Sequence, residues 1–568
     1  MMKNKTTLGF WLILASLALT GCSLFYSSHS ASTSSLVTSS EGTSSGENTS
    51  TTPTSSSNTT TSNSSSLVST STSSSGGSSS SSSSGTSSSK TSSSGTSSNP
   101  SSSSSVQKDG VYQFYAINDF HGSVLENSTS YYEGGLAKVG GKLKALKAAD
   151  PDHTFIISSG DMWQGSLESN SNYGALVTEV MNNIGFDSMT LGNHEFDYGQ
   201  SYIQTNRKAA NFPFLAGNIR TYSNGTMGAA WEGSDISTVI SRGGIKVGIV
   251  GMIGQGQTTS ITSKNVADLY FDDPQSYAET EATRLRNSEG CDIVILSLHD
   301  PIAVPEGWES SGLKAYFDGV FCAHSHQKEV DLASGVPYLQ GICNGEGISH
   351  FELTMSNGVT SCTNYEFISA SSSWTDDSEI LQIEQGYIGT EEFTTLASKT
   401  CGTLSGFLTK YTIANAGCKA IYEKYKKNHS DLALAMENSQ RASLSSGTIS
   451  YSSLYKATPF MNKIVIMKVL GQDITNEAAY NKTYTGDTTT YGTLNASTYY
   501  TVAVIDYLAY HQSIYKSYDY FPSLVDTNII AEYNAYPVDI TFDYFASLSG
   551  TISSSSFADT ATGFNLYK

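Results

Sequence analysis

At 568 residues the chain is longer than one typical domain, so two folded domains with additional unfolded segments are expected. It has 51 acidic and 31 basic residues and a formal net charge of −20. Nucleic-acid polymers are excluded as partners, because binding a phosphate backbone needs clustered Lys and Arg and no run here is strongly basic. Mononucleotides are not excluded, since they need only a local positive site.

The first 22 residues are typical of a secretion signal. Lys3 and Lys5 precede an apolar run over residues 8–19. The run is too short for a comfortable membrane span, and the Leu-Thr-Gly-Cys at its end resembles the bacterial lipobox, so we expect Cys22 to be lipidated. The alternative is an uncleaved anchor helix with an incidental cysteine. Both interpretations place the body of the protein outside the cytoplasmic membrane, and the first predicts a lipid-anchored protein at the bacterial cell surface.

Residues 23–109 are dominated by Ser and Thr and have too few apolar side chains to build a core. A flexible segment of about 85 such residues has an r.m.s. reach of roughly 50 Å. We interpret it as a disordered stalk that extends the folded part from the membrane. A glycosylated or adhesive segment is the alternative.

Residues 110–367 alternate between apolar strands and helices, a pattern that predicts an α/β sandwich or doubly wound layer. The expected strands are 111–118, 154–159, 188–191, 245–251, 292–298 and 319–323, and the expected helices are 135–147, 173–184 and 277–286.

Residues 368–403 are expected to form a linker with one helix near 379–385. Residues 404–568 predict a smaller α+β domain. Its expected helices are 414–427 and 538–548, and its expected strands are 463–470 and 499–504.

Six cysteines remain if Cys22 carries lipid. None has the C-x-x-C spacing of a zinc ribbon or redox motif, and both disulfides and buried thiols stay open. They are Cys291, Cys322, Cys343, Cys362, Cys401 and Cys418.

Metal-type ligands follow the expected strands, where α/β folds place reactive side chains. Asp119 and His121 come after the first strand, and a carboxylate two residues from an imidazole can share one cation with it. Asp161 follows the second strand behind Gly160, and its two oxygens can bridge a pair of ions.

The third strand ends in a motif that combines two functions. Asn193 offers an amide oxygen as a metal ligand, whereas His194 can face substrate. Asp197 lies three residues beyond His194, a spacing that lets it accept the imidazole N–H and fix the tautomer. The pair resembles a general-acid dyad.

Two further strands end in His299 and in the His324-Ser325-His326 sequence. A lone histidine at a strand end is usually structural or exposed. Here five of the ten histidines lie in such motifs, each after an apolar strand, so we interpret them together as a site.

The sequences N-D-F-H-G, G-D-x-x-x-G-S, G-N-H-E-F-D-x-G and H-S-H resemble the calcineurin-like metallophosphoesterases, specifically the bacterial 5′-nucleotidase family, over residues 111–367. The resemblance implies a four-layer α/β/β/α sandwich. It also implies two metal ions, one held by Asp119, His121, Asp161 and His326, the other by Asp161, Asn193, His299 and His324.

Mixed nitrogen and oxygen ligands suit divalent Zn, Mn, Co or Fe better than Ca, and ligand type does not choose among the four. The resemblance implies that two cations activate a water for in-line attack on phosphorus, while His194 stabilises or protonates the leaving oxygen. One departure is His299-Asp300-Pro301, where relatives commonly have a small or glycine-containing turn, so an altered local turn is expected.

Residues 431–434, 441–444 and 459–462 resemble the family's substrate-binding domain. This resemblance implies that Arg441 contacts phosphate and that Phe460 and Tyr507 sandwich the base, with Asn462 nearby. Core packing is the alternative for the two rings. Residues 436–440 and 511–514 replace glycine-rich family segments, so neither base nor sugar preference is predicted.

The expected function is extracellular, metal-dependent hydrolysis of nucleoside 5′-monophosphates to nucleoside and phosphate. Within the same class, 2′,3′-cyclic-nucleotide phosphodiesterase or UDP-sugar hydrolase activity is the alternative. The alternative from another class is a non-catalytic surface protein that captures ligands. The sequence predicts no oligomeric state.

Overall fold

The computed structural model describes residues 108–128, 132–308, 312–438, 440–481, 484–485, 494–510 and 519–557. The predicted signal segment with Cys22 and all but the last two residues of the predicted stalk lie outside the described residues. Within the described part, no helix combines the length and hydropathy needed to cross a membrane.

Two six-stranded sheets form the first folded region. The first has the order β15-β14-β1-β2-β3-β4, and the second has the order β12-β13-β11-β10-β8-β7. The first contains β1 (Gly110–Ile117), β2 (Thr154–Ser158), β3 (Ser188–Thr190), β4 (Phe214–Leu215), β14 (Gly347–Ser356) and β15 (Val359–Ser369). The second contains β7 (Ser237–Arg242), β8 (Ile245–Ile253), β10 (Ile293–His299), β11 (Gly319–Cys322), β12 (Glu329–Ala333) and β13 (Val336–Gln340).

The central strands of each sheet are parallel. In the first sheet β1, β2, β3 and β4 run parallel, and β14 and β15 add antiparallel strands at one edge. In the second sheet β8, β10, β11 and β13 run parallel between antiparallel edges. The carboxyl ends of the parallel strands therefore meet at one edge of each sheet, where α/β folds bind ligands.

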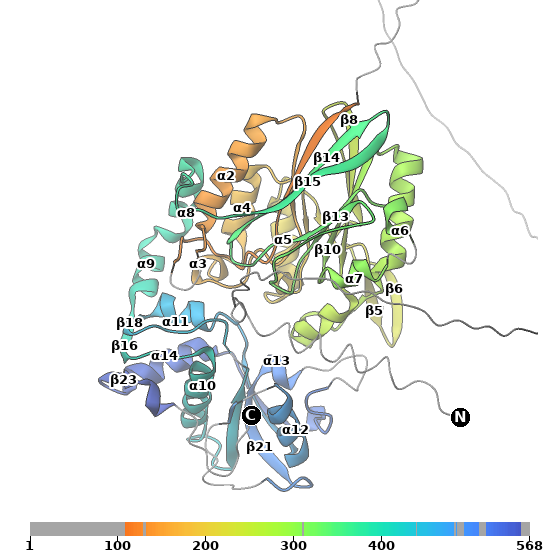
Figure 1. Cartoon of the computed structure of the whole chain (residues 1–568). Helices are drawn as coiled ribbons and strands as arrows, with labels where there is room; N and C mark the ends of the chain where they lie inside the picture. The colour runs from red at the N-terminus through yellow and green to blue at the C-terminus, as the bar shows by residue number, and fades with distance from the viewer. Residues whose placement is uncertain are drawn as a thin grey trace, which may run out of the picture. The chain divides into compact units, whose positions relative to one another are not determined.

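Helices cover the outer face of each sheet (Figure 1). Helices α2 (Gly135–Ala149) and α4 (Ala175–Ile184) pack on the first sheet, and α6 (Pro274–Arg284) packs on the second. A third core, which includes Phe114 and Phe321, fills the space between the sheets. This arrangement confirms the predicted four-layer α/β/β/α sandwich.

Local sequence explains why α4 forms and ends where it does. Leu176, Val180 and Ile184 recur at helical spacing and are buried against the first sheet. Gly185 follows in the left-handed conformation at φ +82°, and its N–H caps the Met181 carbonyl. The apolar face and its glycine stop therefore define the helix.

Two helices follow β15. Helix α8 (Ser378–Ile388) packs Ile380 and Ile383 against the core that contains α2 and α4. Helix α9 (Glu391–Ser398) instead packs Phe393 and Leu396 in a core formed mainly by later residues. The sequence predicted only one helix in this segment.

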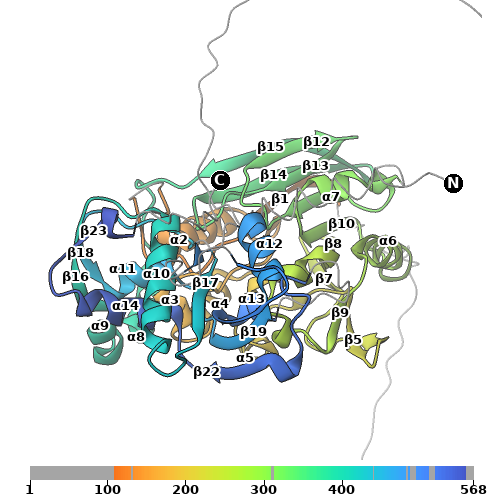
Figure 2. The same cartoon turned by 90° about the horizontal axis from the view of Figure 1, so that it is seen from below.

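The C-terminal region is α+β, as predicted. Its main sheet has the order β20-β17-β21-β19-β22, and a smaller one has the order β18-β16-β23. The main sheet contains β17 (Leu432–Glu437), β19 (Ile464–Leu470), β20 (Tyr484–Thr485), β21 (Tyr499–Ile505) and β22 (Ile529–Tyr533). The smaller contains β16 (Thr400–Ser405), β18 (Gly447–Ser450) and β23 (Thr551–Ser553). The helices are α10 (Lys410–Tyr425), α11 (Tyr451–Ala457), α12 (Gly471–Asn481), α13 (Asp506–Ala509) and α14 (Pro537–Ser547), with α10 beside β17 (Figure 2).

Shorter elements complete the first region. The sequence did not predict the three-stranded sheet of β5 (Ile219–Ser223), β6 (Thr226–Ala230) and β9 (Leu269–Phe271), or helices α3 (Leu167–Asn170), α5 (Gln200–Ala209) and α7 (Ala303–Glu306). Within the described residues none of the six cysteines forms a disulfide, and all but Cys362 are buried.

Candidate active site

All five sequence motifs lie at the carboxyl ends of parallel strands. The first sheet supplies Asp119 and His121 after β1, Asp161 after β2, and Asn193 and His194 after β3. The second sheet supplies His299 at the end of β10, with His324 and His326 after β11.

Several of these residues have a backbone conformation that L-residues rarely adopt. The φ angles are +48° at Asp119, +51° at His121, +56° at Asp161, +77° at His324 and +58° at His326. Non-glycine residues in the left-handed region are uncommon and concentrate at functional sites, where surrounding contacts hold them in place. The loops are therefore constrained by their contacts and not by local preference.

One cluster contains Asp119, His121 and His326. Their candidate ligand atoms lie within 4.8 Å of one another. The Nε2 atoms of His121 and His326 are 2.9 Å apart, and His326 Nε2 is 3.6 Å from Asp119 Oδ1. His121 Nδ1 lies 2.9 Å from the Gln164 carbonyl, where it donates, so its Nε2 lone pair faces the cluster.

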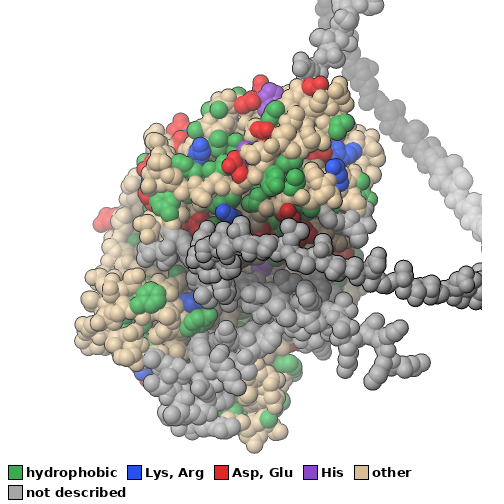
Figure 3. All heavy atoms as spheres, in the orientation of Figure 1, with side chains coloured by type: hydrophobic (Ala, Val, Ile, Leu, Met, Phe, Trp, Pro, Cys, Tyr) green, Lys and Arg blue, Asp and Glu red, His purple; other side chains and the backbone are tan. Residues whose placement is uncertain are grey.

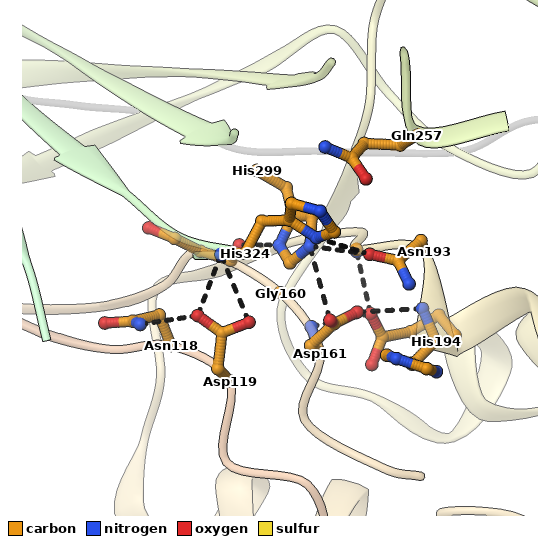
Figure 4. Close-up of polar contacts among 12 residues, drawn as sticks. Asn118, Asp119, Gly160, Asp161, Asn193, His194, Gln257, His299 and His324 are labelled. Atoms are coloured by element: carbon orange, nitrogen blue, oxygen red, sulfur yellow. Dashed lines mark hydrogen bonds and ion pairs between the residues drawn. The ribbon is translucent and has the colours of Figure 1, made fainter. Parts of the chain in front are cut away.

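A second cluster contains Asp161, Asn193, His299 and His324 (Figure 4). Asn193 Oδ1 is 3.1 Å from His299 Nε2 and 2.9 Å from His324 Nδ1. Asp161 Oδ2 is 3.3 Å from His299 Nε2 and has no hydrogen-bond partner in the described chain. Because His299 Nδ1 donates to the Ser159 carbonyl at 2.7 Å, its Nε2 is the ring nitrogen that faces the two oxygen acceptors.

Hydrogen-bond acceptors that face one another, as in both clusters, need a positive charge between them. The pKa shifts of the histidines agree with a cation at this position. Burial lowers the pKa of His324 to about 3 and holds that of His121 and His326 well below the ordinary value. Burial also lowers the pKa of His299, but Asp161 and Asp119 outweigh it and raise that pKa to about 10. Three imidazoles are thus in the neutral form that binds metals, and His299 lies where a cation is attracted. The residues present therefore fit a divalent metal.

His194 lies beside the clusters, paired with Asp197. His194 Nδ1 is 2.7 Å from Asp197 Oδ2, and its backbone N–H donates to Asp161 Oδ1 at 2.8 Å. Burial lowers the pKa of His194, but the neighbouring Asp197 and Asp161 carboxylates outweigh it, and the net shift is upward. The imidazole is oriented by its own loop, which is the geometry that a general acid requires.

Arg441 extends from the C-terminal region to His194. Its Nη2 lies 3.4 Å from His194 Nε2 and donates to Gln164 Oε1 at 3.2 Å. Its buried Nε has no hydrogen-bond partner in the described chain. The guanidinium therefore keeps a donor for an anion close to the metal-type clusters.

The other three predicted substrate-binding residues, Phe460, Tyr507 and Asn462, have different surroundings. Phe460 lies 5.3 Å from the Arg441 guanidinium and 6.5 Å from the His194 ring. Tyr507 donates its hydroxyl to the Thr259 carbonyl at 3.1 Å and packs beside Tyr520. Asn462 is half-buried in the loop before β19. Phe460 thus borders the site directly, whereas the base sandwich stays a prediction.

The sequence motifs did not identify several side chains that hold the site loops. Asn118 donates to Asp119 Oδ2 at 2.7 Å and exchanges hydrogen bonds with the Gly341 backbone. Gln340 donates to the Gln327 carbonyl and to Ser325, beside His326. Asn118 stands in the quoted N-D-F-H-G motif, which was a usable signal, whereas Gln340 had none.

The turn after His299 carries a buried acidic side chain. Asp300 accepts a hydrogen bond from Gln257 Nε2 at 2.8 Å, and burial raises its pKa to about 6. Gln257 is drawn close to His299 in Figure 4. The Asp300–Gln257 hydrogen bond thus holds the turn directly after His299, and the departure from the family's turn stays a prediction.

Acidic and basic side chains are interspersed on the face drawn in Figure 3, with no extended basic patch over the described residues there. Positive charge near the site comes instead from Arg441. This distribution suits a small phosphate ester better than a nucleic-acid polymer.

Comparisons with known proteins agree with this geometry. Residues 112–328 match the calcineurin-like phosphoesterase family, and residues 398–479 match the 5′-nucleotidase C-terminal domain. Protein UshA of Escherichia coli is 24% identical over 65% of this chain and 76% of its own length. A Vibrio cholerae 5′-nucleotidase is 22% identical over 63% and 73% respectively.

Solved structures share the fold. The 5′-nucleotidase precursor of Thermus thermophilus superimposes with a TM-score of 0.63 at 18% identity, over 78% of this chain and 97% of that structure. The chain belongs to the calcineurin-like metallophosphoesterases that carry a 5′-nucleotidase C-terminal domain, and it is a hydrolase of phosphate ester bonds.

Proposed function

We propose that the chain is an extracellular, metal-dependent 5′-nucleotidase that converts nucleoside 5′-monophosphates to nucleoside and phosphate. The observation that carries this proposal is the position of Arg441, a C-terminal residue, beside His194 and the two metal-type clusters. The sequence relatives named as 5′-nucleotidases support the nucleotide as substrate. The unpartnered Arg441 Nε offers the phosphate a charged donor.

Two divalent ions, of Zn, Mn, Co or Fe, are proposed as cofactors. Asp119, His121, Asp161 and His326 would hold one, and Asp161, Asn193, His299 and His324 would hold the other. When bound, such ions lower the pKa of a coordinated water and neutralise phosphate oxygens.

The chain's own residues have separate roles in this proposal. His194 gives a proton to the leaving nucleoside oxygen, and Asp197 fixes the imidazole tautomer from 2.7 Å. Arg441 binds the phosphate. Phe460 stacks on the base and Tyr507 covers its other face, while Asn462 contributes a polar contact at the same end.

Location and domain limits belong to the proposal as well. Residues 1–22 form a lipoprotein signal peptide, Cys22 carries the lipid, and residues 23–109 form the stalk. The catalytic domain spans residues 110–367, a linker spans 368–403 and the substrate-binding domain spans 404–568. A lipid anchor of this kind would keep the enzyme on the outer face of the cytoplasmic membrane.

The test measures the products of each compound under Mn, Zn and Co in turn: phosphate from AMP and from an aryl phosphate ester, adenosine monophosphate from 2′,3′-cyclic AMP, and UMP with glucose 1-phosphate from UDP-glucose. We expect AMP to be the best substrate and Asp161→Ala to abolish turnover. A preference for the cyclic nucleotide or the nucleotide sugar would replace the substrate assignment. An enzyme that leaves every compound intact would contradict hydrolysis of nucleotides altogether.

A further inference from the structure

Glu195 is a fully buried carboxylate next to the site, and none of the roles above uses it. It lies in a short 3-10 helix, His194–Phe196, that follows β3. Its Oε2 accepts the N–H of Gly192 at 2.7 Å and that of Asp161 at 2.8 Å. Its Oε1 accepts the N–H of Met162 at 2.8 Å and that of Trp163 at 3.4 Å.

These contacts join two loops from different strands. Three of the four amides are consecutive in the loop after β2, and consecutive amides that follow a left-handed residue form a concave anion site. Asp161 is that residue, at φ +56°. The buried charge of Glu195 is satisfied by the four amides, and hydrogen bonds to a carboxylate are stronger than neutral ones.

Asp161 in turn accepts a hydrogen bond from the loop that carries Glu195. Its Oδ1 accepts the N–H of His194 at 2.8 Å, while its Oδ2 accepts no hydrogen bond and lies at ion-pair distance from His299 Nε2, 3.3 Å away. Gly192 must lack a side chain here, because a Cβ would lie 2.2 Å from Asp161 Oδ1. The two loops thus form a reciprocal clasp that fixes one Asp161 oxygen and leaves the other available.

We propose that Glu195 is a positioning residue: its carboxylate holds the Asp161 loop in its left-handed conformation and thereby presents Asp161 Oδ2 to the metal site. This role rests on the proposed two-metal function, because it acts through Asp161. Glu195 itself contacts neither substrate nor metal ligand side chains. Its partners are backbone amides, so the role requires a carboxylate with two acceptor oxygens on a side chain as long as that of glutamate.

The first test is Glu195→Gln in the full chain, which turns one acceptor oxygen into an NH2 group that opposes the amide donors. We expect the Mn²⁺ concentration for half-maximal binding, measured by calorimetry on metal-free protein, to rise about 10–100-fold. At saturating Mn²⁺ we expect kcat for AMP to fall while KM stays within about twofold, because the substrate contacts are untouched. A variant that binds Mn²⁺ and turns over AMP like the parent overturns the role.

Glu384→Gln is the matched control, since Glu384 is also a buried carboxyl but lies on α8. We expect it to leave Mn²⁺ affinity, kcat and KM unchanged. If it weakens Mn²⁺ binding as much as Glu195→Gln does, the effect is general destabilisation and the role is wrong.

A measurement on the unmodified protein covers the case in which Glu195→Gln does not fold. Hydrogen exchange of metal-free protein should show protected amides at residues 161–163 and 192, because Glu195 binds them without metal. Rapid exchange there overturns the clasp. If the unmodified chain binds no metal and hydrolyses no nucleotide while these amides are protected, the proposed function fails and the clasp stands.

Discussion

The pairing of His194 with Asp197 leads to a prediction that separates leaving-group catalysis from general stabilisation. Asp197→Asn keeps the shape of the side chain but removes the charge 2.7 Å from His194 Nδ1. A hydrogen bond to a charged group contributes about 1.5–3 kcal/mol. At roughly 1.4 kcal/mol per tenfold in rate, we expect kcat for AMP to fall about 10–100-fold.

The substrate determines how large this loss is. The nucleoside alkoxide needs a proton as it leaves, whereas an aryl phosphate releases a more stable oxyanion that needs little help. We therefore expect a clearly smaller loss of kcat with the aryl phosphate than with AMP. The assay is steady-state phosphate release from both esters at saturating Mn²⁺.

The chain offers a matched control in its other i,i+3 His–Asp pair. His153 Nδ1 lies 2.9 Å from Asp150 Oδ1, with side chains 35% and 49% exposed against 17% and 18% for His194 and Asp197. Asp150→Asn should leave both activities within about twofold, because exposed pairs contribute little. Equal losses with both esters in Asp197→Asn would refute proton donation by His194, and no loss at all would refute the pairing itself.

Three further predictions concern substrate contacts and stability. Arg441→Ala should raise KM for AMP about 10–100-fold by removing a charged phosphate donor, and an unchanged KM in steady-state assays would contradict phosphate binding. Phe460→Ala should raise KM about 5–100-fold for AMP but not for ribose 5-phosphate, since base stacking contributes about 1–3 kcal/mol; equal effects on both would indicate core packing. Burial raises the pKa of Glu437 from 4.5 to about 8, so between pH 4.5 and 8 this carboxyl ionises only in the unfolded chain. The free energy of unfolding should therefore fall as pH rises through this range. Glu437→Gln should remove up to roughly 5 kcal/mol of that fall in urea unfolding at pH 5 and pH 8, and an identical fall in both proteins would contradict the shift.

The parallel strands could be predicted because the apolar side chains that bury them also form apolar runs in the sequence. The strand β10 is apolar along its length and is buried on both faces, and it ends at His299 as predicted. The strand β15 was missed, because its polar and exposed residues do not form the apolar run of a covered strand. Strand β17 was missed for a different reason: a short apolar run does not distinguish a strand from a buried helix.

The candidate site also has residues that the sequence predicted and residues whose roles it did not predict. The side chains that point into the site stand at strand ends in recognisable motifs, so Asp119, Asp161 and His299 could be chosen from the sequence. Glu195 stands in the quoted G-N-H-E-F-D-x-G motif, but its partners, like the Gln327 carbonyl that Gln340 binds, are backbone atoms of other segments. Backbone partners leave no mark on residue type or spacing, so a single sequence does not reveal these roles.

The most direct test of the central claim is a Mn²⁺ titration of metal-depleted protein during continuous measurement of phosphate release from AMP. The two proposed metal sites, to both of which Asp161 would contribute, predict no release without metal and full activity once two ions are bound per chain. Full activity in the presence of excess chelator, or no release at any Mn²⁺, Zn²⁺ or Co²⁺ concentration, would contradict a two-metal nucleotidase.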